Sequence, residues 1–473
     1  MKKKKFTSNI VIGIECHINT NSKTKLFCGC SNTPSTVPNS QCCPVCLGHP
    51  GSKPVLNKKC VEQALKLCLA LNCKISPELI FSRKSYFYPD MAKNYQISQY
   101  EIPLGKNGKL ILDSGKEIGI TRVHMEEDPA ALVHPGEIAK SSYVLIDYNR
   151  SGTPLIEIVT EPDLSSPEEA REFMNHLITI LNYLEIFEFE TCIVKADANI
   201  SLKESGYERV EVKNVTGFKE IERALFYEVA RQKTEVEDGR KIIKETRGWD
   251  SDKGITYSLR QKETEEEYGY IIDPDLVRIG ISKDWIEDIK REMPELAREK
   301  ALRFTKEHKI KEIDAKILSQ EKLLGELFER VAKEIDPVLA AKWLRRELIR
   351  VLNYNKKSLQ EVEIDERNLI ELLRLIEKKK ITEQTGQRLM ERLIEKPFNV
   401  KEYVKQQGME IIKESTELEK YCEEAIKENP DAVNDYKKGI EKALHFIMGK
   451  VMAKSKGKAS PKEVTDILKR LLK

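Results

Sequence analysis

Four cysteines near the N-terminus have the spacing of metal ligands. Cys28-x-Cys30 and Cys43-x-x-Cys46 are separated by a span of twelve residues. Two short pairs on two turns can bring four thiolates to one point, as tetrahedral zinc requires. The spacing therefore predicts a structural zinc knot, in which Cys42 is a fifth thiol that could compete for the metal.

Two other interpretations of this cysteine segment stay open. The thiols could be small buried side chains that bind nothing. A redox Cys-x-x-Cys pair would need a helix after it, and Pro44 with the Gly-His-Pro-Gly run at 48–51 argues against one. Eleven cysteines in 473 residues are too few for a disulfide scaffold.

The run IVIGIECHIN at 10–19 reads as a strand with one polar face. Side chains alternate across a strand, so Glu15 and His17 point the same way while Ile14 and Cys16 form an apolar side. A carboxylate and an imidazole on one face suit a divalent cation or a general acid/base pair. An ordinary hydrogen bond on a half-solvated strand is the alternative.

Two more strand-like runs carry acids. The run ITRVHMEEDPA at 120–130 places Arg122, His124, Glu126 and Asp128 on one face and Glu127 on the other. The run TPLIEIVTEPD at 153–163 holds Glu157 among apolar residues, where a carboxylate is costly unless it is paired, for example with Arg150, or bound to metal. Three acid-bearing strands in one domain predict a Mg²⁺ site of oxygen ligands and one imidazole.

Two polar segments could bind a nucleotide or line a passage. One is a predicted hairpin at 194–215 with alternating charged and amide groups. The other, at 81–101, interleaves basic and aromatic residues, which suits phosphate contact and base stacking. A solvated sheet face and half-buried packing are the respective alternatives. With Arg150, the residues predicted to contact a substrate or nucleotide or to line a passage are Arg83, Lys84, Tyr86, Tyr88, Lys195, Asp197, Asn199 and Lys213.

Familiar phosphate-binding loops are missing from the chain. It has no G-x-x-x-x-G-K-[ST] and no G-x-G-x-x-G after a strand, and it has no G-x-S-x-G nucleophile motif. A nucleotide would therefore have to be bound through metal and charged side chains.

The C-terminal segment is strongly basic. Residues 437–473 contain eleven Lys or Arg and three acidic residues, although the whole chain has a net charge of only +3. A basic loop and helix fit the backbone of a structured RNA, and a solvated helix end is the alternative. The predicted RNA-binding residues are Lys450, Lys454, Lys456 and Lys458.

Patterning divides the chain into three parts. Residues 1–292 read as α+β with a largely antiparallel sheet, 293–400 as a helical domain and 401–473 as a helical tail. Capping boxes are predicted at 166–169 and 460–463. The basic start is a poor signal peptide because Glu15 and His17 interrupt its apolar stretch, and no run is long enough for a membrane helix. We expect a cytoplasmic protein that does not contact a membrane.

Many of these stretches together resemble the GatB/GatE family, the B subunits of tRNA-dependent amidotransferases. The matching runs lie in order along nearly the whole chain and include IGIECHINTNSKTKLFCGCS, CPVCLGHPG, RKSYFYPDMAKNYQISQY, GITRVHMEEDPA, DYNRSGTPLIEIVTEPD, ADANISL, VEVKNV, ETRGWD and ALHFIMGKVMAKSKGKASP. The resemblance implies a cradle domain, a helical domain and a YqeY-like tail. The chain length leaves no room for the large inserted domain of the E-type relatives.

The resemblance also implies an activity. The family uses ATP to phosphorylate the side-chain carboxylate of Glu-tRNA(Gln) or Asp-tRNA(Asn), and ammonia from the A subunit (GatA, an amidase) then forms the amide. A small C subunit (GatC) completes the enzyme, and association with the cognate aminoacyl-tRNA synthetase is implied. The expected cofactors are Mg²⁺ and structural Zn²⁺, with ATP as substrate.

By position, the family's functional residues fall on the groups singled out above. The implied Mg²⁺ ligands and catalytic residues are Glu15, His17, Glu126, Glu127 and Glu157, and the implied Zn²⁺ ligands are Cys28, Cys30, Cys43 and Cys46. The chain departs from the family pattern at Lys195, where relatives often have Arg, and in YGYIIDPDL at 268–276. A non-enzymatic zinc-containing RNA-binding scaffold and a metal-dependent phosphoesterase are the alternative functions.

Overall fold

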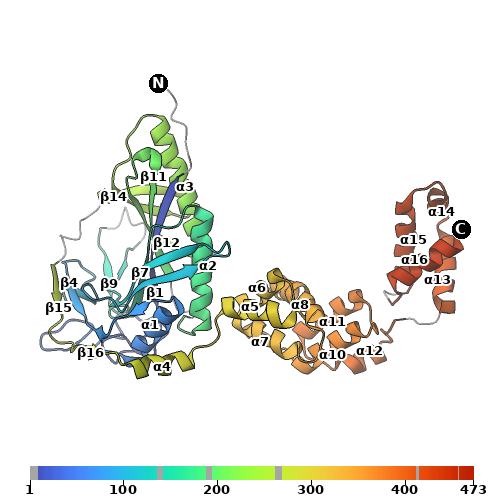
Figure 1. The fold of residues 1–473 in the computed structure, drawn as a ribbon, viewed down its shortest axis with the longest axis horizontal. Coiled ribbons are helices and arrows are strands. Elements are labelled where there is room, and N and C mark those ends of the chain that lie inside the picture. Colours follow the sequence, from blue (N-terminus) through green and yellow to red (C-terminus); the bar gives the residue numbers. More distant parts are fainter. Residues whose placement is uncertain are drawn as a thin grey trace. The chain divides into compact units, whose positions relative to one another are not determined.

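The protein divides into two compact units, residues 1–296 and 297–473. The computed structural model in Figure 1 describes residues 9–135, 142–187, 194–261, 269–411, 415–455 and 458–472. Lys456 and Tyr268, which figure in the sequence analysis, lie outside these described residues.

The first unit is built on one large sheet. A nine-stranded sheet has the order β14-β13-β12-β11-β1-β10-β7-β6-β2, and all of its neighbours are antiparallel except β12 and β13. Smaller sheets have the orders β15-β4-β5, β16-β3 and β8-β9. The strands are β1 (Ile10–Asn19), β2 (Lys74–Ile75), β3 (Glu78–Leu79), β4 (Ser82–Ser85), β5 (Tyr95–Ser98), β6 (Gly105–Ile111), β7 (Glu117–Glu127), β8 (Ala131–Val133), β9 (Leu145–Asp147), β10 (Pro154–Thr160), β11 (Val194–Leu202), β12 (Val210–Thr216), β13 (Glu245–Asp250), β14 (Ile255–Gln261), β15 (Gly269–Ile272) and β16 (Ile279–Gly280).

One face of the large sheet is apolar and is covered by helices. These are α1 (Lys58–Ala70), α2 (Pro167–Tyr183) and α3 (Phe218–Glu237), and Figure 1 shows α2 and α3 running alongside the strands. Cys16 of β1 points to this side, where its Sγ lies 3.4 Å from Met174 Sδ of α2. A short η2 (Lys203–Ser205) follows β11, and α4 (Lys283–Glu292) closes the unit. The predicted mixed, largely antiparallel fold is confirmed.

The second unit contains only helices among its described residues. Its buried apolar side chains form one cluster from Phe304 to Val404 and another from Leu418 to Leu472. The predicted domain boundary near residue 400 stays a prediction. The elements are α5 (Ala297–His308), α6 (Glu312–Gln320), α7 (Lys322–Val331), α8 (Pro337–Trp343), the π-helix η4 (Leu344–Leu348), α9 (Ile349–Tyr354), η5 (Leu359–Glu361), α10 (Glu366–Glu377), α11 (Glu383–Glu395), α12 (Val400–Gln406), α13 (Ser415–Glu428), α14 (Pro430–Lys437), α15 (Glu441–Lys454) and α16 (Pro461–Leu471).

Neither of the two predicted capping boxes forms completely. Ser166 Oγ accepts from Glu169 N at 3.2 Å, but the Glu169 carboxylate binds Ser165 N and Lys116 instead of returning to Ser166 N. At the start of α16, Ser460 is the N-cap residue and Pro461 follows it, yet the serine side chain makes no capping bond. Both helices nevertheless begin where the pattern predicts.

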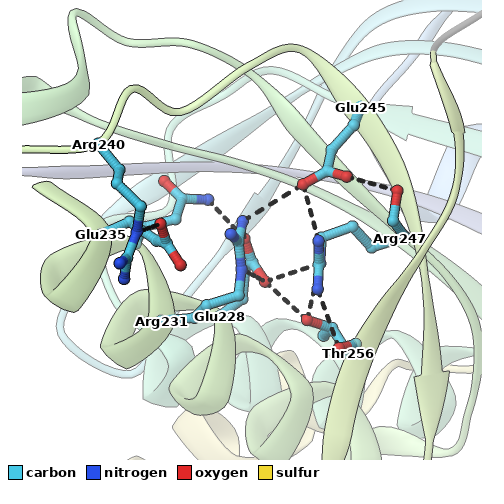
Figure 2. A network of polar contacts seen from close by, with 9 residues as sticks. Glu228, Arg231, Glu235, Arg240, Glu245, Arg247 and Thr256 are labelled. Atoms are coloured by element: carbon cyan, nitrogen blue, oxygen red, sulfur yellow. Dashed lines mark hydrogen bonds and ion pairs between the residues drawn. The ribbon is translucent and has the colours of Figure 1, made fainter.

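No helix of the described ranges is long and apolar enough to cross a membrane. The longest described helix of the large-sheet unit, α3, packs four apolar side chains into the core and is also bonded to the sheet by a buried polar network, drawn in Figure 2. The side chain of Glu228 is fully buried, and both of its oxygens accept from Arg231, at 3.0 and 2.5 Å. Thr256 of β14 also donates to Glu228, at 2.9 Å. The network therefore fixes α3 to the β13–β14 edge of the sheet.

Glu228→Gln should destabilise this unit by about 3 kcal/mol, because it leaves the half-buried guanidinium of Arg231 without its full counter-charge. Glu235→Gln on the same helix is the matched control, since Glu235 pairs with Arg240 at the surface and should change nothing measurable. Urea denaturation with amide exchange in α3 measures the difference. Equal stability of the two variants would contradict the role given to the buried network.

Candidate functional site

A row of ionisable groups crosses the centre of the large sheet on its polar face. Residues directly opposite each other on antiparallel strands share a face. His17 of β1 lies opposite Glu157 of β10, which lies opposite His124 of β7. On the other side of β1, Glu15 and His17 lie opposite Asp197 and Lys195 of β11. The alternation predicted for Glu15 and His17 is confirmed.

Glu157 is the centre of this row. Its Oε2 lies 3.4 Å from His17 Nε2 and 3.5 Å from His124 Nε2, while its Oε1 lies 3.4 Å from an Arg122 nitrogen. His17 Nε2 is also 3.4 Å from Glu15 Oε1. One imidazole thus lies between two carboxylates, and one carboxylate between two imidazoles.

Burial and charge oppose each other at these groups. Burial alone would lower the pKa of His17, but the Glu15 and Glu157 carboxylates raise this pKa well above its usual value. Burial likewise works to raise the pKa of Glu157, yet His124, His17 and Arg122 hold it below its usual range. The site therefore favours an anionic Glu157 with positive charge around it.

Two sets of these side chains have the geometry to hold a metal ion. The ligand atoms of Glu15, His17 and Glu157 all lie within 4.8 Å of one another, and so do those of His124, Glu126 and Glu157. Carboxylate oxygens with an imidazole fit Mg²⁺ or Mn²⁺. Nδ1 of His124 is buried and has no hydrogen-bond partner. Sequence reasoning did not propose His124 as a ligand, although the alternation had already placed it beside Glu126.

Glu127 and Arg150 lie elsewhere. Glu127 points to the opposite face from Glu126, where it pairs with Lys93 and accepts from Ile97 N at 3.0 Å. Its role as a metal ligand stays a prediction. Arg150 does not pair with Glu157, because it donates to the carbonyls of Pro129 and Ala130 at 2.9 and 2.6 Å. Arg122, on the neighbouring strand and the same face, is the guanidinium that reaches Glu157.

The polar face continues onto β11 and β12. Lys213 Nζ lies 3.1 Å from an Asp197 oxygen and 3.7 Å from a Glu211 oxygen. Although burial would lower the pKa of Lys213, these two carboxylates raise it. Burial raises the pKa of Asp197 against the opposing effect of Lys213. The predicted hairpin, which also carries Lys195 and Asn199, thus lies directly beside Glu15, and its functional role stays a prediction.

The basic and aromatic segment lies on a separate small sheet. Arg83 of β4 bonds Asp273 and Asp275 at 2.8 Å each and stacks over Tyr95 at 4.3 Å. Tyr88, by contrast, is exposed. Arg83 is therefore committed to ion pairs, and contact of this segment with a nucleotide, including Lys84 and Tyr86, stays a prediction.

The four predicted zinc ligands come together in one cluster. The sulfur atoms of Cys28, Cys30, Cys43 and Cys46 all lie within 4.8 Å of one another, so they could hold a metal ion. A hydrogen bond from Cys28 lowers the pKa of Cys46, which favours the thiolate that a metal needs. Cys42 is outside the cluster, and its Sγ faces Asn149 at 3.8 Å.

The cysteine cluster contacts the segment that joins β7 to β10. Ser151 Oγ donates to Cys46 O at 2.8 Å, and Leu26 N donates to Gly152 O at 2.9 Å. Gly152 N in turn donates to Asp128 O at 3.0 Å. Gly152 has φ +85, a conformation that favours glycine. The cluster is thus bonded to the turn that precedes β10, and this turn is bonded in its own right to Asp128, the residue after β7.

Comparison with known protein families makes the class of this two-unit protein specific. The GatB/GatE catalytic domain matches residues 10–287, and the GatB domain matches residues 326–472. The chain therefore belongs to the GatB/GatE family, which confirms the resemblance noted in the sequence.

Three similar full-length proteins carry the name of the B subunit of aspartyl/glutamyl-tRNA(Asn/Gln) amidotransferase. The protein from Carboxydothermus hydrogenoformans is 41% identical over 469 residues, covering 97% of this chain and 98% of the relative. That from Thermodesulfovibrio yellowstonii is 42% identical over 473 residues, covering 98% and 99%. That from Thermotoga maritima is 41% identical over 474 residues, covering 98% of both.

Cys28→Ala should lower the zinc content of the purified chain from one ion to none, because three thiolates close a structural site poorly. Cys42→Ala is the control and should keep one ion, since Cys42 lies outside the cluster. Elemental analysis after gel filtration gives both stoichiometries. Zinc retained by the Cys28 variant but lost by the Cys42 variant would mean that a different set of thiols binds the metal.

Proposed function

We propose that this chain is the B subunit of a tRNA-dependent amidotransferase and activates the side-chain carboxylate of misacylated tRNA with ATP. The observation that carries the proposal is the cluster of Glu15, His17 and Glu157, three possible metal ligands on two adjacent strands. It occurs in a chain whose full length resembles proteins named as B subunits of this kind. The substrate is Glu-tRNA(Gln), Asp-tRNA(Asn) or both.

In the first half-reaction, a carboxylate oxygen of the aminoacyl group attacks the γ-phosphorus of ATP, which gives an acyl phosphate and ADP. Glu15, His17 and Glu157 would hold Mg²⁺, with Glu126 as a further ligand; when bound, the ion neutralises negative charge on the phosphates and the carboxylate. Glu126 is buried and lies close enough to His124 and Glu157 to join them.

Cationic side chains beside the metal ligands take the place of a glycine-rich phosphate loop. Arg122 reaches Glu157 but keeps 40% of its side chain exposed, so it can also face a phosphate. Lys195 lies opposite His17. Lys213 holds Asp197 next to Glu15. These groups would attract and orient the triphosphate through charge.

In the second half-reaction, ammonia attacks the activated carbonyl carbon and phosphate leaves, which produces Gln-tRNA(Gln) or Asn-tRNA(Asn). The ammonia would come from glutamine hydrolysed by an amidase A subunit, with a small C subunit completing a cytoplasmic complex. Exposed apolar side chains on the first unit are consistent with such partners, notably Phe87 (87% exposed), Val277 (78%) and Ile271 (55%). A cognate aminoacyl-tRNA synthetase would deliver the charged tRNA to the basic tail.

Reconstitution tests this function. The full chain is assembled with candidate A and C subunits and given Glu-tRNA(Gln) or Asp-tRNA(Asn), ATP and glutamine. We expect ATP-dependent formation of Gln-tRNA or Asn-tRNA. A zinc-containing scaffold would bind tRNA without ATP turnover, and a phosphoesterase would hydrolyse phosphate esters without forming an amide. Absence of amidated tRNA with competent partners would overturn the proposal.

Glu15→Gln should lower ATP-dependent amidation by about 100-fold or more, because it removes an anionic ligand while keeping the shape of the side chain. The A subunit should still hydrolyse glutamine. Glu117→Gln is the matched control, since Glu117 lies on β7 but is exposed and pairs with Lys109. Amidation at the wild-type rate in the Glu15 variant would remove this carboxylate from the proposed ion site.

We further propose that the zinc knot has a structural role in this activity. It is bonded through Ser151 and Leu26 to the turn that precedes β10, and through Gly152 to Asp128 at the end of β7. Buried Lys25 supports the same region, donating to Gln41 O at 2.9 Å and Tyr148 O at 3.3 Å. The knot would thus hold the ends of the strands that carry Glu126 and Glu157.

Zinc removal by a chelator should speed amide exchange at residues 148–153 and reduce amidation, with recovery when zinc is added back. The loss should be partial, because no proposed catalytic group is removed. Exchange at the distant β13–β14 edge is the internal control and should not change. A stoichiometrically zinc-free preparation with full activity would show that the knot is dispensable.

A further inference from the structure

One face of α15 combines an exposed aromatic ring with positive charge. Phe446 is 53% exposed, and the Lys450 ammonium lies 5.1 Å from the centre of its ring. Lys442, one turn before Phe446, is also exposed. Residues four apart lie on one side of a helix, so the ring stands between two lysines. We call Lys442, Phe446, Gly449 and Lys450 the α15 face.

Packing does not account for this face. The buried side of α15 consists of Ala443, Leu444, Ile447 and Val451, so the core of the tail is complete without Phe446. Gly449 is exposed inside the helix, where glycine is unfavourable, and a Cβ there would meet nothing within 4 Å. A glycine that packing does not require leaves room for a ligand to approach the helix backbone next to the ring.

Charge selects the kind of ligand. Residues 437–473 carry eleven Lys or Arg and three acidic residues, so the face lies in the most basic segment singled out in the sequence. Lys454 is less available than the sequence suggested, because its Nζ lies 3.2 Å from Glu424 and 2.7 Å from Glu428. Lys442 and Lys450 are about 12 Å apart along the helix axis, a span that can reach two phosphates.

We propose that the α15 face binds tRNA by stacking one unpaired base on Phe446 while Lys442 and Lys450 contact the flanking phosphates. Aromatic stacking between cationic groups is how proteins bind single-stranded nucleotides, and unpaired bases are the parts of a folded RNA that can stack in this way. The inference takes its substrate, tRNA, from the proposed function. It adds the contact through which the α15 face would bind that tRNA.

The test uses the complete complex. Phe446→Ala should raise the KM for charged tRNA about tenfold, with kcat at saturating tRNA and glutamine hydrolysis unchanged. Phe446→Trp should keep the wild-type KM, whereas Phe446→Leu, which is apolar but cannot stack, should behave like the alanine variant. Phe226→Ala is the matched control, since Phe226 is 48% exposed on α3 of the other unit.

Salt dependence separates stacking from charge. Lys450→Ala should reduce the slope of log binding constant against log salt by about one, while Phe446→Ala leaves the slope unchanged. Binding of uncharged tRNA to the complex, followed by fluorescence anisotropy, gives these slopes without any need for catalysis. A wild-type complex that binds tRNA but forms no amide would refute the proposed function and not the α15 face.

Three results would overturn the inference. An unchanged KM in Phe446→Ala would remove the base contact. Equal behaviour of the Leu and Trp variants would show an apolar contact without stacking. Loss of the A or C subunit from the Phe446→Ala complex in gel filtration would make the face a protein interface.

Discussion

A buried carboxylate at the centre of a sheet is the constraint on which the first unit depends. Glu157 is only 7% exposed on β10, within the strand row β11-β1-β10-β7, and an isolated anion there would be prohibitively costly. His17 and His124 compensate it from the strands on either side, and Arg122 adds a third cation. Removing any one of these partners leaves charge uncompensated, so the strands that bear them must remain in register.

The two faces of the sheet enforce that register. Side chains alternate with a period of two, so a slip of one residue in β1 would move Ile14 and Cys16 to the polar face and bury Glu15 and His17 against α2. Apolar packing against the helices therefore specifies the alignment of the ionisable row, although it takes no part in its chemistry. In the role proposed for it, the zinc knot would support the same alignment through its bond to the turn before β10.

Local pattern predicted much of this arrangement, and pairing across the sheet explains what it missed. Alternation alone placed Glu15 with His17 and separated Glu126 from Glu127, and spacing alone assembled the four cysteines. The sequence suggested Arg150 as the partner of Glu157 because it is near in the chain. Arg122 reaches it instead, since β7 and β10 are neighbours. The helical unit was predicted from its periodicity, but the ion pairs of Lys454 with residues of α13 join helices that local pattern cannot pair.

Charge is distributed differently over the two units, and this follows from what each would bind. On the sheet, carboxylates and cations alternate at short range, which suits a small cation and a triphosphate that must be held in one geometry. On α15, exposed lysines flank an aromatic ring, within a segment at 437–473 that has eleven Lys or Arg and only three acidic residues. A long, flexible polyanion binds more favourably to such an open surface than to a fixed cavity, because each phosphate contact adds affinity without requiring one exact geometry. Substitutions on the sheet could therefore change the proposed reaction, and substitutions on α15 could change the affinity for the proposed substrate, each without affecting the other.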